Sequence, residues 1–391
     1  MATTDAPDPL DDRLALEGLL GQAEQLDEHL LRWTSTRLPG GQGGRSGRPY
    51  DPDRHEAVYY HHDPPSRLRA LIAVHSSVLG PALGGARWQP YADIGEALTD
   101  VLRLSAAMTA KMAVSGLDCG GGKAVIIGDA ATKTPEQLAA YGRFVERLGG
   151  RYVTGTDVGT TLDDLPLIAA HTSRVVGMSP AGEVVKDTAE PTVRTVLHGM
   201  RASLKAVFGD GSLARRRIVV IGVGKVGGEV ARRAAAEGAN VAVTDLYDEI
   251  AAPLASEIGA EHVALDGAYA QPCDVISPNA LGGVLNSSTI PELRCRIVCG
   301  GANNQLLRDP ADADLLAERG IAYAPDYVVN AGGAILVGVD YATGSASPED
   351  MLERVGATTL DLLRVSQREG ISTAEAALRS IDARLAGASG G

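Results

Sequence analysis

The sequence has few cysteines, and they form no recognisable cluster. Its 391 residues include four, with no CxxC spacing and no neighbouring histidine: Cys119, Cys273, Cys295 and Cys299. A zinc site requires close ligand pairs, so we expect no metal site. Unpaired thiols are typical of the reducing cytoplasm, which is the location we predict.

Long apolar segments and an excess of positive charge are also missing. No run of about 18 apolar residues occurs, and no charged-then-apolar leader opens the sequence, so we expect neither a membrane span nor a signal peptide. The 36 basic residues are outnumbered by 49 acidic ones, which gives a formal net charge of -13. Because nucleic-acid surfaces require clustered lysine and arginine, we expect small-molecule partners rather than nucleic acid or membrane.

What is present indicates an α/β protein. The apolar content of 45% supports a sizeable core, and the length suits two domains. Leucines at roughly helical spacing predict an amphipathic helix over residues 10–33, and the Gly- and Pro-rich stretch 38–52 indicates a flexible linker or surface loop. From residue 66 onward, strand-like and helical segments alternate, with a Gly-rich bend expected at 79–88.

A strand, a turn, a helix and a second strand follow one another in RRRIVVIGVGKVGGEVARRAAAEGANVAVTDL (215–246). This context is what the dinucleotide-binding fingerprint GxGxxG requires. Its glycines permit a tight turn, let the backbone approach a pyrophosphate, and let the helix pack on the strand. The cofactor-binding residues predicted in this turn are Gly222, Gly224, Lys225, Val226 and Gly227.

Asp245 ends the second strand, 23 residues after Gly222. A carboxylate at this position accepts hydrogen bonds from the adenosine ribose hydroxyls and repels a 2′-phosphate, so NAD is favoured over NADP. The alternative is a βαβ unit that binds no ligand.

Two lysines twelve positions apart flank a run of three glycines in the segment ending GLDCGGGKAVII (116–127). A lysine held against apolar neighbours and a second cation loses part of its preference for the charged form, so its pKa falls and it becomes able to act as a general base. The other lysine, kept protonated, binds a carboxylate. Two solvated lysines are the alternative, but consecutive glycines favour a place where backbone passes close to a ligand.

Seven ordered stretches, which together span most of residues 55–385, resemble one family. They are LGPALGGARWQPY (79–91), MTAKMAVSGLDCGGGKAVIIGD (108–129), YVTGTDVGTT (152–161), VIGVGKVGGEV (220–230), EGANVAVTDL (237–246), CGGANNQL (299–306) and YAPDYVVNAGG (323–333). The chain is similar to the leucine/valine/phenylalanine dehydrogenase branch of the amino-acid dehydrogenases, which are relatives of glutamate dehydrogenase.

The resemblance implies catalytic roles for three residues. Lys111 resembles the lysine that binds the substrate α-carboxylate. Lys123 resembles the lysine that, as a neutral amine, activates water against an imine carbon. Asp157 resembles the acid that exchanges a proton with the substrate amino group. The implied reaction is NAD-dependent, reversible oxidative deamination of an L-amino acid to the 2-oxo acid and ammonia.

Further positions follow from the same resemblance. Gly84 and Gly85 resemble the pair that admits the substrate backbone, while Asn303 and Asn330 resemble asparagines near the nicotinamide and the substrate. The implied organisation is an N-terminal extension (1–52), a substrate-binding domain (53–188), a Rossmann-type NAD-binding domain (189–340) and C-terminal helices (341–391) that return across the cleft. The family also forms homo-oligomers, which we therefore expect here.

Four positions bear on the choice of amino acid. Glutamate dehydrogenases use a lysine and a serine to hold the distal carboxylate, and the matching positions here are the apolar Leu83 and Val337. A buried γ-carboxylate would find no partner, so glutamate is disfavoured. Gly155 and Ala334 replace larger residues of leucine-type enzymes and leave room for a bulky apolar side chain. Aromatic and branched-chain substrates both stay open, with a lean towards the larger ones.

Two stretches, KDTAEPT (186–192) and SPNALGG (277–283), depart from the family pattern near the expected cleft. A catalytically silent NAD-binding regulatory protein on the same fold is one alternative. A hydroxy-acid dehydrogenase is another, although it would normally use a His–acid pair. The presence of both lysines together with Asp157 favours the amino-acid dehydrogenase.

Overall fold

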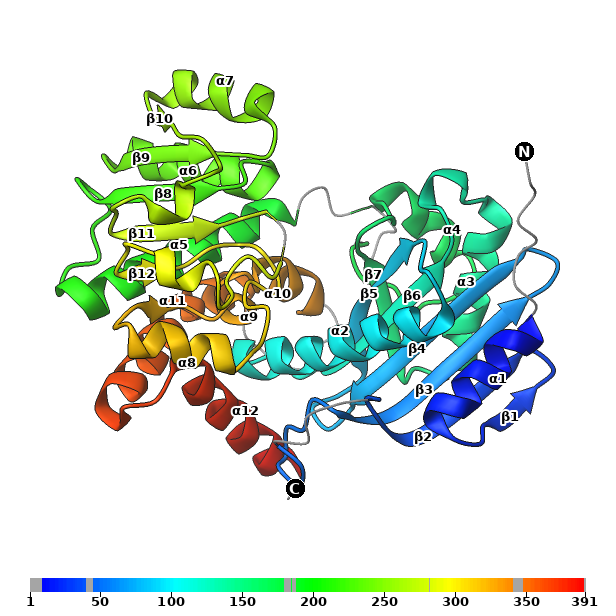
Figure 1. Ribbon diagram of the computed structural model, residues 1–391. Helices are drawn as coiled ribbons and strands as arrows, with labels where there is room; N and C mark the ends of the chain where they lie inside the picture. The colour runs from blue at the N-terminus through cyan, green and yellow to red at the C-terminus, as the bar shows by residue number, and fades with distance from the viewer. Residues whose placement is uncertain are drawn as a thin grey trace.

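The computed structural model describes residues 9–39, 45–178, 184, 188–280, 282–339 and 347–389. They form two α/β lobes that are connected by long helices (Figure 1). The expected α/β architecture, with a Rossmann-type domain beside a second sheet domain, is confirmed.

The first lobe is built on a mixed sheet of seven strands in the order β1-β2-β3-β4-β6-β5-β7. The strands are β1 (Glu24–Asp27), β2 (Leu30–Arg37), β3 (Arg54–Asp63), β4 (Leu68–Ser76), β5 (Ala82–Gln89), β6 (Gly120–Ile127) and β7 (Tyr152–Thr156). β5 lies between β6 and β7 and is parallel to both, whereas the strands from β1 to β4 and the β4–β6 pair are antiparallel. Apolar side chains pack α1 (Pro9–Leu20) and α2 (Ile94–Ser115) against one face, and α3 (Pro135–Arg147) and α4 (Leu165–Ala169) against the other.

The N-terminal extension differs from its expected form. The helix ends at Leu20, and residues 24–37 form the β1–β2 hairpin, so the helix expected over 10–33 is wrong beyond residue 20. The carboxylate of Asp27 accepts a hydrogen bond from the His29 backbone N–H at 2.8 Å and closes the turn between the two strands. β2 then pairs along the free edge of β3, and the extension becomes part of the sheet.

Residues 45–51 are anchored rather than free, which corrects the expected linker. Arg45 pairs with Asp382, and the buried Tyr50 donates its backbone N–H to the same carboxylate at 2.8 Å. Residues 40–44 of that stretch lie outside the described residues.

The glycine run lies inside β6, and residues 82–89 form β5 instead of a bend. A Cβ atom on Gly121 would lie 2.1 Å from the backbone nitrogen of Thr109 in α2, and one on Gly120 would lie 2.1 Å from the carbonyl oxygen of Ser76. Packing inside the protein therefore accounts for these two glycines, and the approach of a ligand to the run stays a prediction. The close approach is between β6 and the protein's own backbone.

The second lobe contains a parallel six-stranded sheet in the order β10-β9-β8-β11-β12-β13. Its strands are β8 (Arg217–Ile221), β9 (Asn240–Thr244), β10 (Glu261–His262), β11 (Val275–Pro278), β12 (Ile297–Val298) and β13 (Ala322–Tyr323). Its principal helices are α5 (Ala189–Phe208), α6 (Lys225–Ala236), α7 (Asp248–Ile258) and α8 (Ala311–Glu318). This strand order is that of the doubly wound dinucleotide-binding fold.

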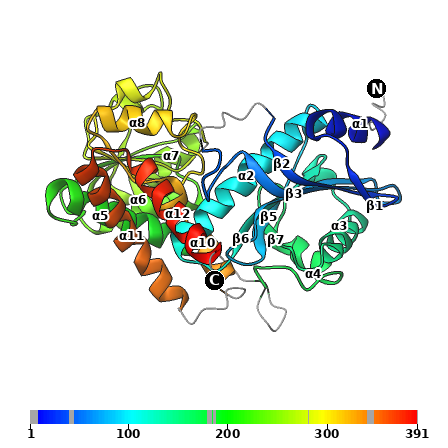
Figure 2. The same cartoon turned by 90° about the horizontal axis from the view of Figure 1, so that it is seen from below.

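Four helices complete the junction between the lobes: α9 (Asp326–Val329), α10 (Gly332–Gly338), α11 (Pro348–Glu369) and α12 (Thr373–Ser389). These helices and the C-terminal half of α2 share one apolar core. Met112, Leu117 and Ile335 belong to this core. Arg384 of α12 donates to the carbonyl oxygens of Ala113 and Leu117 at the end of α2. Figure 2 shows α2 extending from the first lobe towards these helices. Lys111 is thereby placed where the two lobes meet.

Across the described parts of the chain, none of the helices is both long and apolar enough to cross a membrane. Within the same residues, no three His, Cys, Asp or Glu side chains gather in a way that could hold a metal ion. All four cysteines are free thiols, three of them buried.

Candidate active site

Lys123 and Asp157 form an ion pair. Lys123 is on β6 and only 7% exposed, and Asp157 directly follows β7. The lysine Nζ lies 2.8 Å from Asp157 Oδ2. Because β5 separates the two strands, the pair forms across β5, where Gly85 presents no side chain; a Cβ there would lie 3.1 Å from Asp157 Cβ.

The second cation beside Asp157 is Arg87 of β5. Its Nε lies 3.2 Å from the same Oδ2 atom. Burial alone would raise the pKa of the Asp157 carboxyl, but the charges of Lys123 and Arg87 outweigh burial and hold that pKa below its usual value. Asp157 is therefore an ionised carboxylate beside a buried amine, an arrangement suited to exchanging protons with a bound substrate.

Lys111 and two asparagines meet across the lobe junction. The Lys111 ammonium donates to Asn303 Oδ1 at 3.4 Å, and the Asn330 amide donates to the same oxygen at 2.8 Å. Asn303 follows β12 and Asn330 follows α9, so both belong to the nucleotide-binding side. The structure thus brings together these three residues, which were predicted from stretches far apart in the sequence.

The Lys111 environment lowers its pKa to about 8. Burial is the main cause and the nearby Lys123 adds to it, while Asp326 and Asp157 act in the opposite direction. Asp326 is itself buried, and its carboxylate accepts hydrogen bonds from the Asn304 backbone N–H and the Tyr323 hydroxyl. At neutral pH Lys111 is mostly cationic, as binding of a carboxylate requires.

The four predicted specificity positions lie together with one unpredicted residue, Val176. Leu83, Val176, Ala334 and Val337 belong to one apolar cluster at the junction. A Cβ on Gly155 would lie 2.9 Å from Val176 Cγ2. The space that glycine leaves is therefore filled by the buried Val176, and Gly155 does not by itself enlarge the pocket.

Gly84 has the same kind of close protein neighbour as Gly85. A Cβ on Gly84 would lie 1.8 Å from the carbonyl oxygen of Gly122, and one on Gly85 would lie 2.2 Å from that of Thr156. Packing of the three parallel strands explains both glycines, whether or not a substrate backbone also approaches them.

The fingerprint turn has the shape that a pyrophosphate requires. Gly222 adopts a φ of 86°, and a Cβ on Gly227 would lie 2.0 Å from the Gly222 carbonyl oxygen. Gly224 and Lys225 are exposed at the start of α6, and no atom lies within 4 Å of a Cβ built on Gly224. The N-terminus of α6 has no side-chain cap, so its positive dipole end is open to an anion. Val226, the next residue along, is half-buried.

Two polar groups of this lobe, one beside the turn and one beside Asn303, also fit a dinucleotide. Asp245 Oδ2 accepts the Val223 backbone N–H at 2.8 Å, which fixes the carboxylate beside the turn. Asn330 Oδ1 is buried and has no hydrogen-bond partner among the described residues. A buried acceptor without a partner is costly. The carboxamide N–H of a nicotinamide is a donor that would satisfy it.

The two segments that depart from the family pattern, 186–192 and 277–283, contact residues beside the candidate active site. In α5, the Thr192 hydroxyl accepts the Gly333 backbone N–H at 3.1 Å, next to Ala334. After β11, Asn279 Oδ1 accepts the Gly301 backbone N–H at 2.8 Å, two residues before Asn303. Residues 186–187 and Leu281 lie outside the described residues.

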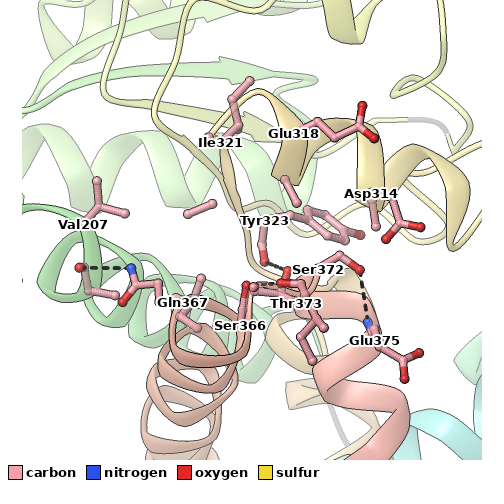
Figure 3. Close-up of a pocket in the computed structure, with 18 of the residues that line it drawn as sticks. Val207, Asp314, Glu318, Ile321, Tyr323, Ser366, Gln367, Ser372, Thr373 and Glu375 are labelled. Carbon is pink, nitrogen blue, oxygen red and sulfur yellow. Dashed lines mark hydrogen bonds between the residues drawn. The ribbon is translucent and has the colours of Figure 1, made fainter.

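A cavity of about 780 Å³ lies elsewhere, where α8 and β13 meet the α11–α12 turn. Figure 3 shows Tyr323, Ser366 and Thr373 on its walls. The residues predicted for catalysis or cofactor binding are not among those that line it, so it is separate from the candidate active site.

Residue types alone did not reveal Arg87, Asp326 or Val176. The first two are charged residues in otherwise apolar surroundings, and that feature is a visible signal of a polar network. Val176 gives no such signal, because only the folded chain places it against Gly155.

Comparison with known proteins defines the class to which this fold and site belong. Residues 55–174 match the dimerisation domain of the Glu/Leu/Phe/Val dehydrogenases, and residues 247–358 match the Glutamate/Leucine/Phenylalanine/Valine dehydrogenase model. Residues 183–282 also match the NAD binding domain of D-isomer specific 2-hydroxyacid dehydrogenases. The chain belongs to the Glu/Leu/Phe/Val dehydrogenase family, as its motifs indicated.

Individual relatives carry more specific names. A phenylalanine dehydrogenase of Bacillus thermotolerans is 43% identical over 338 residues, covering 85% of this chain and 88% of its own length. A valine dehydrogenase of Streptomyces coelicolor is 43% identical over 346 residues, with coverages of 86% and 93%. The crystal structure of L-tryptophan dehydrogenase from Nostoc punctiforme superimposes with a TM-score of 0.75 at 36% identity, over 86% of this chain and 97% of that one.

Proposed function

We propose that the protein catalyses the reversible oxidative deamination of an apolar L-amino acid, with NAD as the hydride acceptor. The observation that carries this proposal is the meeting of Lys111, Lys123 and Asp157 at the lobe junction, beside the asparagines of the nucleotide-binding lobe. A silent regulatory protein would not need this set of groups.

Each residue has a defined task. Lys111 holds the substrate carboxylate as a cation. The Gly222–Gly227 turn and Asp245 would hold NAD, which would supply the acceptor for the hydride that the substrate α-carbon loses as the amine becomes an imine. Lys123, as a neutral amine, accepts a proton from the water that adds to the imine carbon. Asp157 exchanges a proton with the nitrogen as ammonia leaves, which yields the 2-oxo acid.

The apolar cluster around Leu83 and Val337 supports an apolar substrate side chain, because a second carboxylate would find no partner there. The relatives act on phenylalanine, valine, leucine and tryptophan according to their names, so they support the same class without selecting one member. Asp245 supports NAD rather than NADP. The match of residues 55–174 to a dimerisation domain supports a homo-oligomer formed through the first lobe.

The test is absorbance at 340 nm with NAD and a panel of apolar L-amino acids at alkaline pH, with glutamate and NADP as matched comparisons. We expect NADH with one or more aromatic or branched-chain amino acids and none with glutamate. A purified, folded protein that binds NADH yet reduces NAD with no member of the panel would refute the proposal.

A further inference from the structure

Arg87 joins the active-site carboxylate to a second, more distant carboxylate. Its Nε lies 3.2 Å from Asp157 Oδ2, and its Nη1 lies 3.1 and 3.0 Å from the two oxygens of Asp100 in α2. The Tyr91 hydroxyl donates to Asp100 at 2.7 Å. A continuous polar chain thus connects Tyr91, Asp100, Arg87, Asp157 and Lys123.

The two cations that contact Asp157 differ in whether they keep their proton during the reaction. An arginine keeps its proton throughout the physiological pH range, whereas a lysine that acts as a base must release its own. When Lys123 becomes neutral, Asp157 loses one of its two counter-ions. Without a second, fixed cation, burial would then raise the pKa of the Asp157 carboxyl.

We propose that Arg87 is a positioning residue, which holds the Asp157 carboxylate in place and ionised throughout the reaction so that Lys123 can exchange its proton independently. This inference rests on the proposed function. Arg87 acts through Asp157 and does not touch the reacting atoms.

The surroundings of Asp157 leave this task to Arg87. Among the residues that the structure describes, the titratable groups that act on Asp157 or are affected by it include Lys123, Arg87, Lys111 and Tyr152. Lys111 is engaged with Asn303 and is assigned to the substrate carboxylate, and Tyr152 donates its hydroxyl to the Gly84 carbonyl oxygen. The Arg87 side chain is 21% exposed, and its two carboxylate partners prevent it from swinging into solvent.

The experiment compares R87M, R87K and D100N with the wild type, and uses R232M as a matched control because Arg232 forms an exposed ion pair with Glu257. The pH profile of kcat/KM for deamination is measured for each folded variant. Removing the Arg87 cation makes the Lys123–Asp157 pair hold its proton more tightly. We therefore expect the acid limb of the R87M profile to shift to higher pH by about one unit. R87K keeps the charge but lacks the planar fork, so its limb stays in place while kcat falls about tenfold.

Asp100→Asn keeps Arg87 and removes an anion behind it, so its acid limb does not move upward. R232M matches the wild type. An R87M profile that coincides with that of the wild type overturns the proposal. If R87M fails to fold, an R87K enzyme with wild-type kcat overturns it instead.

A second readout does not need turnover. The 13C resonance of the Asp157 carboxyl, assigned by its loss in D157N, titrates at a higher pH in R87M than in the wild type. An unchanged titration, with a wild type that forms NADH, overturns the Arg87 proposal alone, whereas a wild type that forms no NADH refutes the proposed function on which it rests.

Discussion

The Lys111 ammonium and the Asn303 amide oxygen lie 3.4 Å apart although they belong to different lobes. Lys111 is assigned to the substrate carboxylate and Asn303 to the cofactor side. If these proposed roles are right, their contact places the substrate carboxylate beside the cofactor, and a motion that separates the lobes at this point would break this hydrogen bond.

Replacing Lys123 by alanine removes the proposed base and the partner of Asp157. We expect kcat to fall by about 1,000-fold, within the range of general acid–base contributions, while NADH binding measured by fluorescence stays within about threefold. Lys205→Ala, in the exposed part of α5, is the matched control and should behave as the wild type. Near-normal turnover by K123A would exclude the assigned role.

The lowered pKa of Lys111 predicts that the affinity of the protein for carboxylates depends on pH. Its pKa is about 8, so the side chain is charged below that pH and progressively neutral above it. The inhibition constant of 3-phenylpropanoate, which has no titration of its own in this range, should therefore rise by about tenfold per pH unit above pH 8. K111M should bind it weakly at every pH. A constant that is flat up to pH 10 in the wild type would contradict this.

Gly155 and Val176 should behave as a coupled pair. Gly155→Ala places a methyl group 2.9 Å from Val176 Cγ2, and we expect kcat/KM to fall by about tenfold, with recovery in the G155A/V176A double variant. V176A alone enlarges the pocket and should raise the phenylalanine-to-valine ratio of kcat/KM by about tenfold. Val263→Ala, a buried valine of the other lobe, controls for general loss of packing. An unchanged ratio in V176A places Val176 outside the pocket.

Asp245→Asn tests the cofactor preference. The amide removes the charge that repels a 2′-phosphate and weakens the bonds to the ribose, so the NAD-to-NADP ratio of kcat/KM should fall by about 30-fold or more. Asp248→Asn, an exposed acid at the start of α7, should leave the ratio unchanged. Equal ratios in D245N and the wild type would show that the carboxylate does not face the ribose.

The nucleotide-binding half was predictable because its information is local. The strand, the turn, the helix and Asp245 occupy one continuous stretch, and Gly222 has a positive φ of 86° within the turn itself. The N-terminal half was less predictable. Leu26 and Leu30 continue the helical spacing of the first segment, yet the turn at Asp27–His29 and pairing with β3 make them part of a hairpin.

The glycine-rich stretches show the limit of local interpretation most clearly. Gly121 and Gly155 both suggested space for a ligand, whereas Thr109 and Val176 occupy that space. Neither neighbour is close in the sequence. The roles of Lys111, Lys123 and Asp157 came from a family resemblance, and the Arg87–Asp100 pair required the folded sheet and helix together.

α12 makes polar contacts with both lobes. Arg45 and Tyr50 bind its Asp382, its Arg384 binds the end of α2, and its Thr373 hydroxyl donates to the Tyr323 carbonyl oxygen of the nucleotide-binding lobe. A helix fixed to both lobes cannot travel with one of them alone. If the lobes rotate relative to one another, we therefore expect residues near α12 to be displaced less than residues at the far ends of the lobes.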